Sequence, residues 1–175
     1  MTAVMTAAGR KCIVVMGVSG CGKSTVALAL AQRLGLSFVE GDSLHPPRNV
    51  ALMASGTALT DEDRHDWLQA VAAALARAEA GGAVVACSAL RRSYRDRLRA
   101  SAPGLRLVHL VGTEALLAQR LEQRAGHYMP ASLLRSQIDT LESPGADERA
   151  VTLNISSPTQ QLVDEICRHL ETTQP

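Results

Sequence analysis

The strongest constraint on the fold of this 175-residue chain is a glycine-rich stretch near its beginning, Gly17-Val18-Ser19-Gly20-Cys21-Gly22-Lys23-Ser24. It fits the pattern G-x-x-x-x-G-K-[ST], follows the apolar run Ile13 to Met16 and opens a helix-like stretch, Ser24 to Leu34. In such a turn the backbone N–H groups form a concave nest for phosphate, and the helix N-terminus adds positive potential. The stretch therefore predicts a phosphate-binding loop (P-loop) between a buried strand and a helix.

This loop predicts ATP and Mg²⁺ as cofactors. We expect Lys23 to reach the β- and γ-phosphates and take part in catalysis, and Ser24 to ligate Mg²⁺. The predicted nucleotide-binding residues are Gly17, Ser19, Gly20, Cys21, Gly22, Lys23, Ser24 and Thr25, together with Arg120 and Arg124. A P-loop alone does not fix a reaction. A nucleotide-dependent switch, an assembly ATPase and a regulatory module with an inactive loop are therefore alternatives to a kinase.

Apolar runs alternate with helix-like stretches along the rest of the chain. Strands are expected at 13–16, 36–39, 83–87, 105–111 and 151–155, and runs that are apolar throughout suit a parallel sheet buried on both faces. Helices are expected at 24–34, from Thr60 to about Glu79, from Thr113 to about Arg124, and from Pro158 onward. The pattern predicts an α/β fold, a three-layer P-loop domain over 1–175 with a five-stranded parallel sheet and helices on both faces.

The segment from Ala125 to Gly145 fits this alternation least well. It holds one short helical stretch between Gly126 and Pro144, and we expect it to act as a mobile lid. Arg124 precedes this lid, so its closure would bring a positive charge onto the transferring phosphoryl group. Arg120 lies four residues earlier on the same helical face; it is expected either to assist or to be a surface residue.

The overall charge argues against large anionic partners. A formal net charge of +1 creates no broad field for nucleic acid or anionic lipid. No apolar run approaches the roughly 20 residues that a membrane span needs, and residues 1–10 lack the features of a signal peptide. The four cysteines form neither a CxxC pair nor a zinc-ligand pattern. We therefore expect a cytoplasmic protein with reduced thiols that binds neither nucleic acid nor membrane.

Polar groups follow two further strands, at the edge where a parallel sheet gathers its ligands. Glu40 and Asp42 come after the second strand, which we expect beside the P-loop strand, and Ser88 follows the third. A carboxylate there holds Mg²⁺ through water or takes the proton of an attacking hydroxyl. The alternative is a pair of solvated loop acids. We assign Asp42 to catalysis and substrate binding, Glu40 to the metal and Ser88 to the substrate.

Beyond the P-loop, several blocks of residues stand in a characteristic order. They are Gly41-Asp42-Ser43-Leu44-His45-Pro46-Pro47-Arg48-Asn49, Met53-Ala54-Ser55-Gly56, Leu59-Thr60-Asp61-Glu62-Asp63-Arg64, Trp67-Leu68, Cys87-Ser88-Ala89-Leu90, Tyr94-Arg95-Asp96, Gly126-His127 and Pro144-Gly145-Ala146-Asp147-Glu148. In this order the blocks resemble the gluconokinase family, although many members have aspartate at the position of Glu40. The resemblance implies a nucleoside-monophosphate-kinase-like fold, ATP-dependent phosphorylation of D-gluconate at its 6-hydroxyl, and a homodimer.

The substrate that this resemblance implies is an acid, so its pocket needs a cation. Arg48 and Arg64 are the first candidates, because each stands inside a matching block and a guanidinium group suits a carboxylate. An exposed helical arginine is the alternative for each. The predicted substrate contacts are Asp42, His45, Arg48, Arg64, Ser88, Arg91 and His127, of which His45 could equally serve only to hold its loop. The nearest rival is a kinase of the same fold for shikimate, a nucleoside monophosphate or another sugar acid.

The stretch from Arg91 to Arg99 is rich in arginine but has helical spacing. Leu90, Tyr94 and Leu98 recur every four residues and predict an apolar stripe, while Arg92 and Asp96 are spaced to pair. We therefore expect an amphipathic helix and not a nucleic-acid site. Its arginines are expected to be mostly solvated, with Arg91 and Arg95, near the end of the third strand, as the exceptions. Trp67 is expected in the core or in a pocket wall.

Overall fold

The structure is a computed structural model that describes residues 11–78, 81–124 and 130–173. Its centre is a parallel sheet of five strands in the order β2-β3-β1-β4-β5. The strands are β1 (Cys12–Met16), β2 (Ser37–Glu40), β3 (Ala83–Ala86), β4 (Arg106–Val111) and β5 (Val151–Asn154). Both β1 and β3 are buried along their whole length, as the continuous apolar runs predict.

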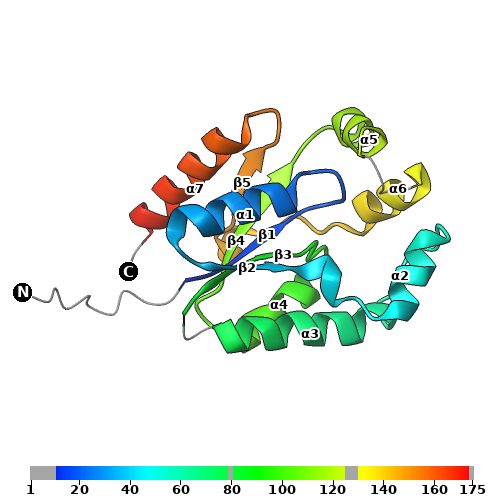
Figure 1. Cartoon of the computed structure of the whole chain (residues 1–175), viewed down its shortest axis with the longest axis horizontal. Coiled ribbons are helices and arrows are strands. Elements are labelled where there is room, and N and C mark those ends of the chain that lie inside the picture. The colour runs from blue at the N-terminus through cyan, green and yellow to red at the C-terminus, as the bar shows by residue number, and fades with distance from the viewer. Residues whose placement is uncertain (1–10, 79–80, 125–129, 174–175) are drawn as a thin grey trace, which may run out of the picture.

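Seven α-helices and two short 3₁₀ turns are described. They are α1 (Lys23–Leu34), η1 (Gly41–Leu44), α2 (Pro47–Ala54), α3 (Asp63–Ala78), α4 (Arg92–Ser101), α5 (Glu114–Glu122), α6 (Ala131–Thr140), η2 (Ala146–Glu148) and α7 (Thr159–Thr172). Helices α1 and α7 pack together on one face of the sheet, and α3 and α4 pack together on the other (Figure 1). The predicted α/β fold, with a five-stranded parallel sheet between helical layers, is confirmed.

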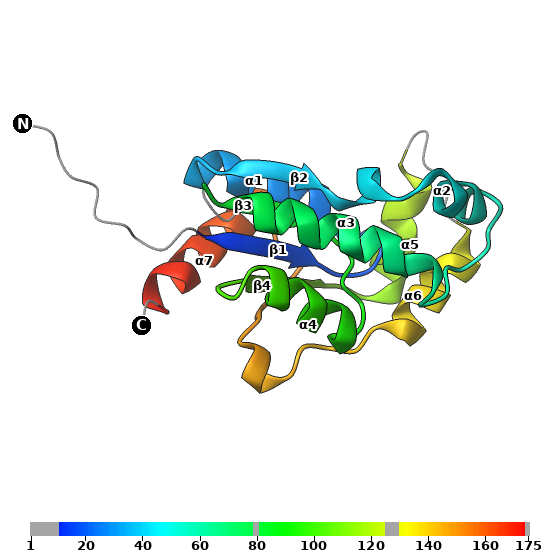
Figure 2. The ribbon, with the colours of Figure 1, turned by 90° about the horizontal axis from the view of Figure 1, so that it is seen from below.

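The interior is built from aliphatic side chains, because aromatic residues make up only 2% of the chain. One cluster of buried residues runs through both sides of the sheet and includes Ile13, Leu30, Leu75, Leu107 and Ile166. Removing these apolar surfaces from water supplies the main stabilisation of the fold. Helices α2, α5 and α6 lie beyond the carboxyl ends of the strands (Figure 2). That is the end at which a parallel sheet usually binds its ligands.

Two features differ from the sequence-based expectation. First, β3 lies between β1 and β2, so the strand that ends at Glu40 is not next to the P-loop strand. The α1 crossover skips one position in the sheet, and pattern alone does not show such a skip. Second, α2 was not expected, although Pro47 at its first position and Gly56 after its end are ordinary helix-boundary signals.

The other helices are close to their expected positions. The short helix expected between Gly126 and Pro144 is present as α6. The Thr60 hydroxyl accepts a hydrogen bond from the Asp63 N–H at 3.2 Å, where α3 begins. None of the described helices has the length and apolarity of a membrane span.

Candidate active site

The P-loop joins β1 to α1 in a shape that requires glycine. Gly17 has φ of +144°, and a Cβ atom there would lie 2.7 Å from the Leu110 carbonyl oxygen. The Gly17 N–H donates to the Ser88 carbonyl oxygen at 3.3 Å, which ties the loop to the end of β3. Lys23 opens α1, and its Nζ donates to the Val18 carbonyl oxygen at 3.0 Å. The loop is therefore formed, with its lysine folded across it.

A cavity of about 550 Å³ opens beside the P-loop. Its lining includes seven of the residues that the sequence assigned to a site: Ser19, Lys23, Asp42, His45, Arg64, Ser88 and Arg124. These residues come from the P-loop, the turn after β2, α3, the turn after β3, and the end of α5. The fold thus brings three cations and one carboxylate to the wall of a single cavity.

Asp42 is placed by a turn that only glycine permits. A Cβ atom on Gly41 would lie 2.2 Å from the Ala86 carbonyl oxygen, because the turn after β2 crosses the end of β3. The indole N–H of the buried Trp67, on α3, donates to the Gly41 carbonyl oxygen at 2.8 Å and holds this turn in place. The Asp42 N–H donates to the Glu40 carboxylate at 3.4 Å, and the Asp42 side chain lines the cavity.

The electrostatics around Cys87, at the end of β3, show that these groups converge. Burial raises the pKa of the Cys87 thiol to about 12; the Ala89 backbone hydrogen bond opposes the rise, Asp42 and Glu40 add to it, and Lys23 also opposes it. Both acids and the P-loop lysine therefore act on the same strand end, although β3 separates β2 from β1. With so high a pKa, the thiol is neutral and unreactive at physiological pH.

The two candidate arginines occupy different environments. Arg64 is 8% exposed; its guanidinium donates to the Tyr94 hydroxyl at 3.3 Å and lies 5.7 Å from the centre of that ring. The Tyr94 hydroxyl in turn donates to Asp61. Among the described residues, no carboxylate forms an ion pair with Arg64. The Arg48 side chain is 75% exposed and pairs with Asp63 at 3.1 Å, outside the cavity.

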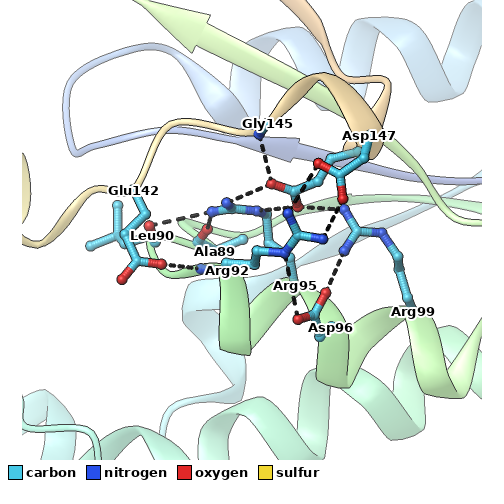
Figure 3. A network of polar contacts seen from close by, with 10 residues as sticks. Ala89, Leu90, Arg92, Arg95, Asp96, Arg99, Glu142, Gly145 and Asp147 are labelled. Carbon is cyan, nitrogen blue, oxygen red and sulfur yellow. Dashed lines mark hydrogen bonds and ion pairs between the residues drawn. The ribbon is translucent and has the colours of Figure 1, made fainter.

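The turn that carries Ser88 is supported by a buried ion pair (Figure 3). Ala89 has φ of +44°, a strained value for a residue with a Cβ atom. The fully buried Arg95 donates to the Ala89 carbonyl oxygen at 3.0 Å and to the Leu90 carbonyl oxygen at 3.3 Å. The same guanidinium pairs with Glu148 at 2.8 Å. Arg95, one of the two arginines not expected on the solvated face of α4, thus supports the cavity wall through hydrogen bonds to its backbone.

A second cavity of about 260 Å³ lies against the other side of the P-loop. It is lined by Cys21, Gly22, Thr25 and Arg120, with Ile155, Ser157, Pro158 and Thr159 from the end of β5 and the start of α7. An Arg120 guanidinium nitrogen donates to the Ile155 carbonyl oxygen at 2.7 Å. The two cavities flank the phosphate nest, so one extended ligand could contact both.

Comparisons with known proteins agree with this geometry. A family profile described as an AAA domain matches residues 12–144. The chain is 48% identical to a gluconokinase of Gluconobacter oxydans over 167 residues, which covers 91% of this chain and 90% of the relative. It is 44% identical over 154 residues to the thermoresistant gluconokinase of Escherichia coli, with 86% and 87% covered. The crystal structure of a gluconokinase from Sinorhizobium meliloti superposes with a TM-score of 0.86 at 48% identity, covering 94% and 93%. The chain belongs to the gluconokinase family.

Several predicted site residues lie outside both cavities. They are Gly17, Gly20, Ser24, Glu40, Arg48 and Arg91. Gly17 and Gly20 shape the P-loop, while the Arg91 Nε lies 3.5 Å from an Asp61 carboxylate oxygen. Cys21 is buried and lines only the second cavity. The prediction for His127 falls outside the described residues.

Two parts of the candidate site were missed from the sequence. The wall from Ile155 to Thr159 follows the carboxyl end of a parallel strand, and that rule alone could have found it. Gln137 on α6 lines the larger cavity, and its Oε1 accepts the Ser19 N–H at 2.8 Å. No local pattern marks Gln137, because its contact joins positions 118 residues apart.

Proposed function

We propose that this protein uses ATP to phosphorylate D-gluconate at its 6-hydroxyl, giving 6-phospho-D-gluconate. One observation carries the proposal: Lys23, Asp42 and the buried Arg64 face one cavity, in a chain whose relatives are named gluconokinases. A sugar acid needs a cation for its carboxylate and a base for its reacting hydroxyl. This cavity offers both beside a P-loop.

The reaction uses the two cavities together. The ATP phosphates occupy the P-loop, the nucleoside end occupies the cavity between Arg120 and Pro158, and gluconate occupies the larger cavity. The oxygen of the gluconate 6-hydroxyl bonds to the γ-phosphorus of ATP, and Asp42 accepts the hydroxyl proton. At the same time the bond between the γ-phosphorus and the oxygen that bridges it to the β-phosphorus breaks, and ADP leaves. Lys23 and Arg124 offset the negative charge of the transferring group.

The remaining predicted contacts complete the substrate pocket in this proposal. Arg64 holds the gluconate carboxylate, and His45 and Ser88 hold hydroxyl groups. Arg48, Arg91 and His127 remain predicted contacts, of which Arg48 is paired with Asp63 outside the cavity. Arg120 serves the nucleoside rather than the phosphates, because it lines the second cavity.

Mg²⁺ is the metal that we propose to accompany ATP. The described part of the chain contains no group of three His, Cys, Asp or Glu side chains that could hold a metal ion. This fits Mg²⁺, which keeps several waters and takes few protein oxygens in addition to the phosphates. Ser24 and Glu40 would hold it, and when bound it neutralises charge on the phosphates.

We further propose that the protein is a homodimer in the cytoplasm. Cys21, Cys87 and Cys167 are free thiols among the described residues, which suits a reducing compartment. The dimer follows from the family resemblance, and light scattering of the purified chain tests it directly.

The proposed activity is tested by following ADP release with and without gluconate, with glucose and shikimate as comparison acceptors. We expect ADP release to depend on gluconate and ³¹P NMR to detect a sugar phosphate. ADP release that is indifferent to gluconate would support a switch or an ATPase instead. A higher turnover with shikimate would support the rival kinase.

Asp42→Asn is the variant that tests the proposed chemistry. It should bind ATP as the wild type does but lose roughly 10²- to 10⁴-fold in kcat, because the general base is removed. Asp66→Asn, at an exposed acid on α3, is the control and should retain activity. Full activity of Asp42→Asn would remove Asp42 from the mechanism.

A further inference from the structure

His45 is held in the cavity wall by a stacked tryptophan. The imidazole and indole rings lie 4.3 Å apart between centroids, at an interplanar angle of 12°. Trp67 is itself buried and fixed through its N–H to the Gly41 carbonyl oxygen. Since one ring face is covered and the plane is set, the His45 ring can meet a ligand only in a restricted orientation.

The Asn49 side chain determines which imidazole nitrogen carries the proton. Asn49 is 2% exposed, and its Nδ2 donates to the backbone carbonyl oxygen of Asp63 at 2.8 Å. A carbonyl oxygen only accepts, so the group that faces it is the NH₂ and not the amide oxygen. The same NH₂ lies 3.3 Å from the His45 Nδ1. Because an amide NH₂ only donates, Nδ1 must accept, and the proton of the neutral ring lies on Nε2.

The surroundings of His45 also favour its neutral form. Burial lowers the pKa of the imidazole; Asp42 opposes this change and Arg64 adds to it. Among the described residues, no hydrogen-bond partner of Nε2 is found, while His45 lines the larger cavity. The free polar atom of the ring is therefore an N–H donor at a ligand-binding wall.

We propose that His45 donates a hydrogen bond from Nε2 to a hydroxyl oxygen of the acceptor, and that Asn49 is the positioning residue that fixes this tautomer. The inference rests on the proposed function for the identity of the acceptor, but not for the tautomer. In this proposal two groups recognise different parts of a polyhydroxy acid. The Arg64 guanidinium binds the carboxylate, and the neutral His45 imidazole donates a directional hydrogen bond to the polyol chain. A second cation at His45 would not distinguish these two parts of the ligand.

The tautomer is tested without any ligand, by ¹⁵N NMR of the histidine side chains in the whole protein. The His45 signals are identified by their loss in His45→Gln. We expect the Nε2–H tautomer at neutral pH, and a mixture of tautomers in Asn49→Ala. An Nδ1–H tautomer or an imidazolium at His45 in the wild type would overturn the proposal, even if Asn49→Ala fails to fold.

The donor role is tested with two substitutions that separate stacking from hydrogen bonding. His45→Phe keeps a ring on Trp67 but has no N–H, whereas the amide of His45→Gln reaches the place of Nε2 with an N–H. We expect the KM for gluconate to rise roughly 5- to 150-fold in His45→Phe and much less in His45→Gln, with the KM for ATP unchanged in both. A wild-type KM for gluconate in His45→Phe would overturn the donor role. Wild-type protein that phosphorylates no gluconate at all would instead reject the proposed function and leave the NMR result standing.

Discussion

At the scale of single residues, burial separates two arginines that the sequence treats alike. Arg64 is buried and has no carboxylate partner among the described residues, whereas Arg48 is exposed and already paired with Asp63. We predict that Arg64→Ala raises the KM for gluconate roughly 10- to 150-fold, because a charge-assisted hydrogen bond is worth about 1.5–3 kcal/mol. Arg48→Ala is the comparison variant and should raise this KM less, because the Arg48 side chain is exposed and already paired with Asp63. Steady-state kinetics on both variants measures the difference.

Glucose provides an independent check on the same residue, since it has the terminal hydroxyl but no carboxylate. The wild type should prefer gluconate strongly in kcat/KM, and Arg64→Ala should narrow that preference by losing the discriminating contact. Comparable wild-type values for the two sugars would reject a carboxylate clamp. An unchanged ratio in Arg64→Ala would assign the clamp to another residue.

Site residues could be predicted from the sequence where a short stretch of sequence determines their position, and not where a contact between distant positions does. Lys23 lies in a contiguous motif and Asp42 directly follows a strand, so short patterns were sufficient to find them. Arg48 and Arg64 could not be ranked, because the sequence does not show which helix face meets the cavity. Gln137 reaches Ser19 across 118 positions, and such a contact exists only after the sheet has formed.

At the scale of elements, the Gln137 side chain connects α6 to the P-loop. The Gln137 Oε1 accepts the Ser19 N–H, and an ATP phosphate in the nest would need the same donor. We predict that Gln137→Ala speeds hydrogen exchange across 131–140 in the ligand-free protein by roughly 2- to 13-fold, the equivalent of about 0.5–1.5 kcal/mol. With ATP and gluconate both bound, exchange in the wild type should slow as the proposed lid closes.

Arg135→Ala is the control on the same helix. Its ion pairs with Glu114 and Asp139 are exposed on both sides, so their loss should leave exchange nearly unchanged. Equal exchange rates across 131–140 in the free and doubly bound wild type would show that α6 is not part of a lid.

The elements themselves were largely predictable, and their order in the sheet was not. Apolar runs identified all five strands. Strands β1 and β3 are buried along their whole length and exclude polar residues, whereas the edge strands β2 and β5 are partly exposed. The position of β3 between β1 and β2 depends on whether the connection from β1 to β2 passes over one strand position, which β3 then fills. That choice is made by packing across the whole sheet, and the segment from Ala83 to Ala86 carries no local sign of it.

At the scale of the whole molecule, Glu148 connects the segment after the proposed lid to α4 and to the turn that carries Ser88. Its carboxylate pairs with the buried Arg95 and with Arg99, and accepts the Gly145 N–H at 3.0 Å. The hydrogen bond from Arg95, opposed by burial and reinforced by Arg99, lowers the pKa of Glu148 from its usual 4.5 to about 2. The stability that this network contributes should therefore depend on pH.

We predict that this contribution is complete above about pH 4.5, where the carboxyl group is ionised in both the folded and the unfolded chain, and is lost as the pH falls toward 2. Glu148→Gln should cost about 3–5 kcal/mol at pH 7, because it leaves the buried Arg95 without its counter-charge. Urea unfolding from pH 7 to pH 3 should show the difference from the wild type shrinking below pH 4.5. Asp147→Asn, at an exposed acid paired with Arg92, is the control and should change stability little. A difference between wild type and Glu148→Gln that stays constant down to pH 3 would contradict the prediction, since protonation would then not compete with the Arg95 pair.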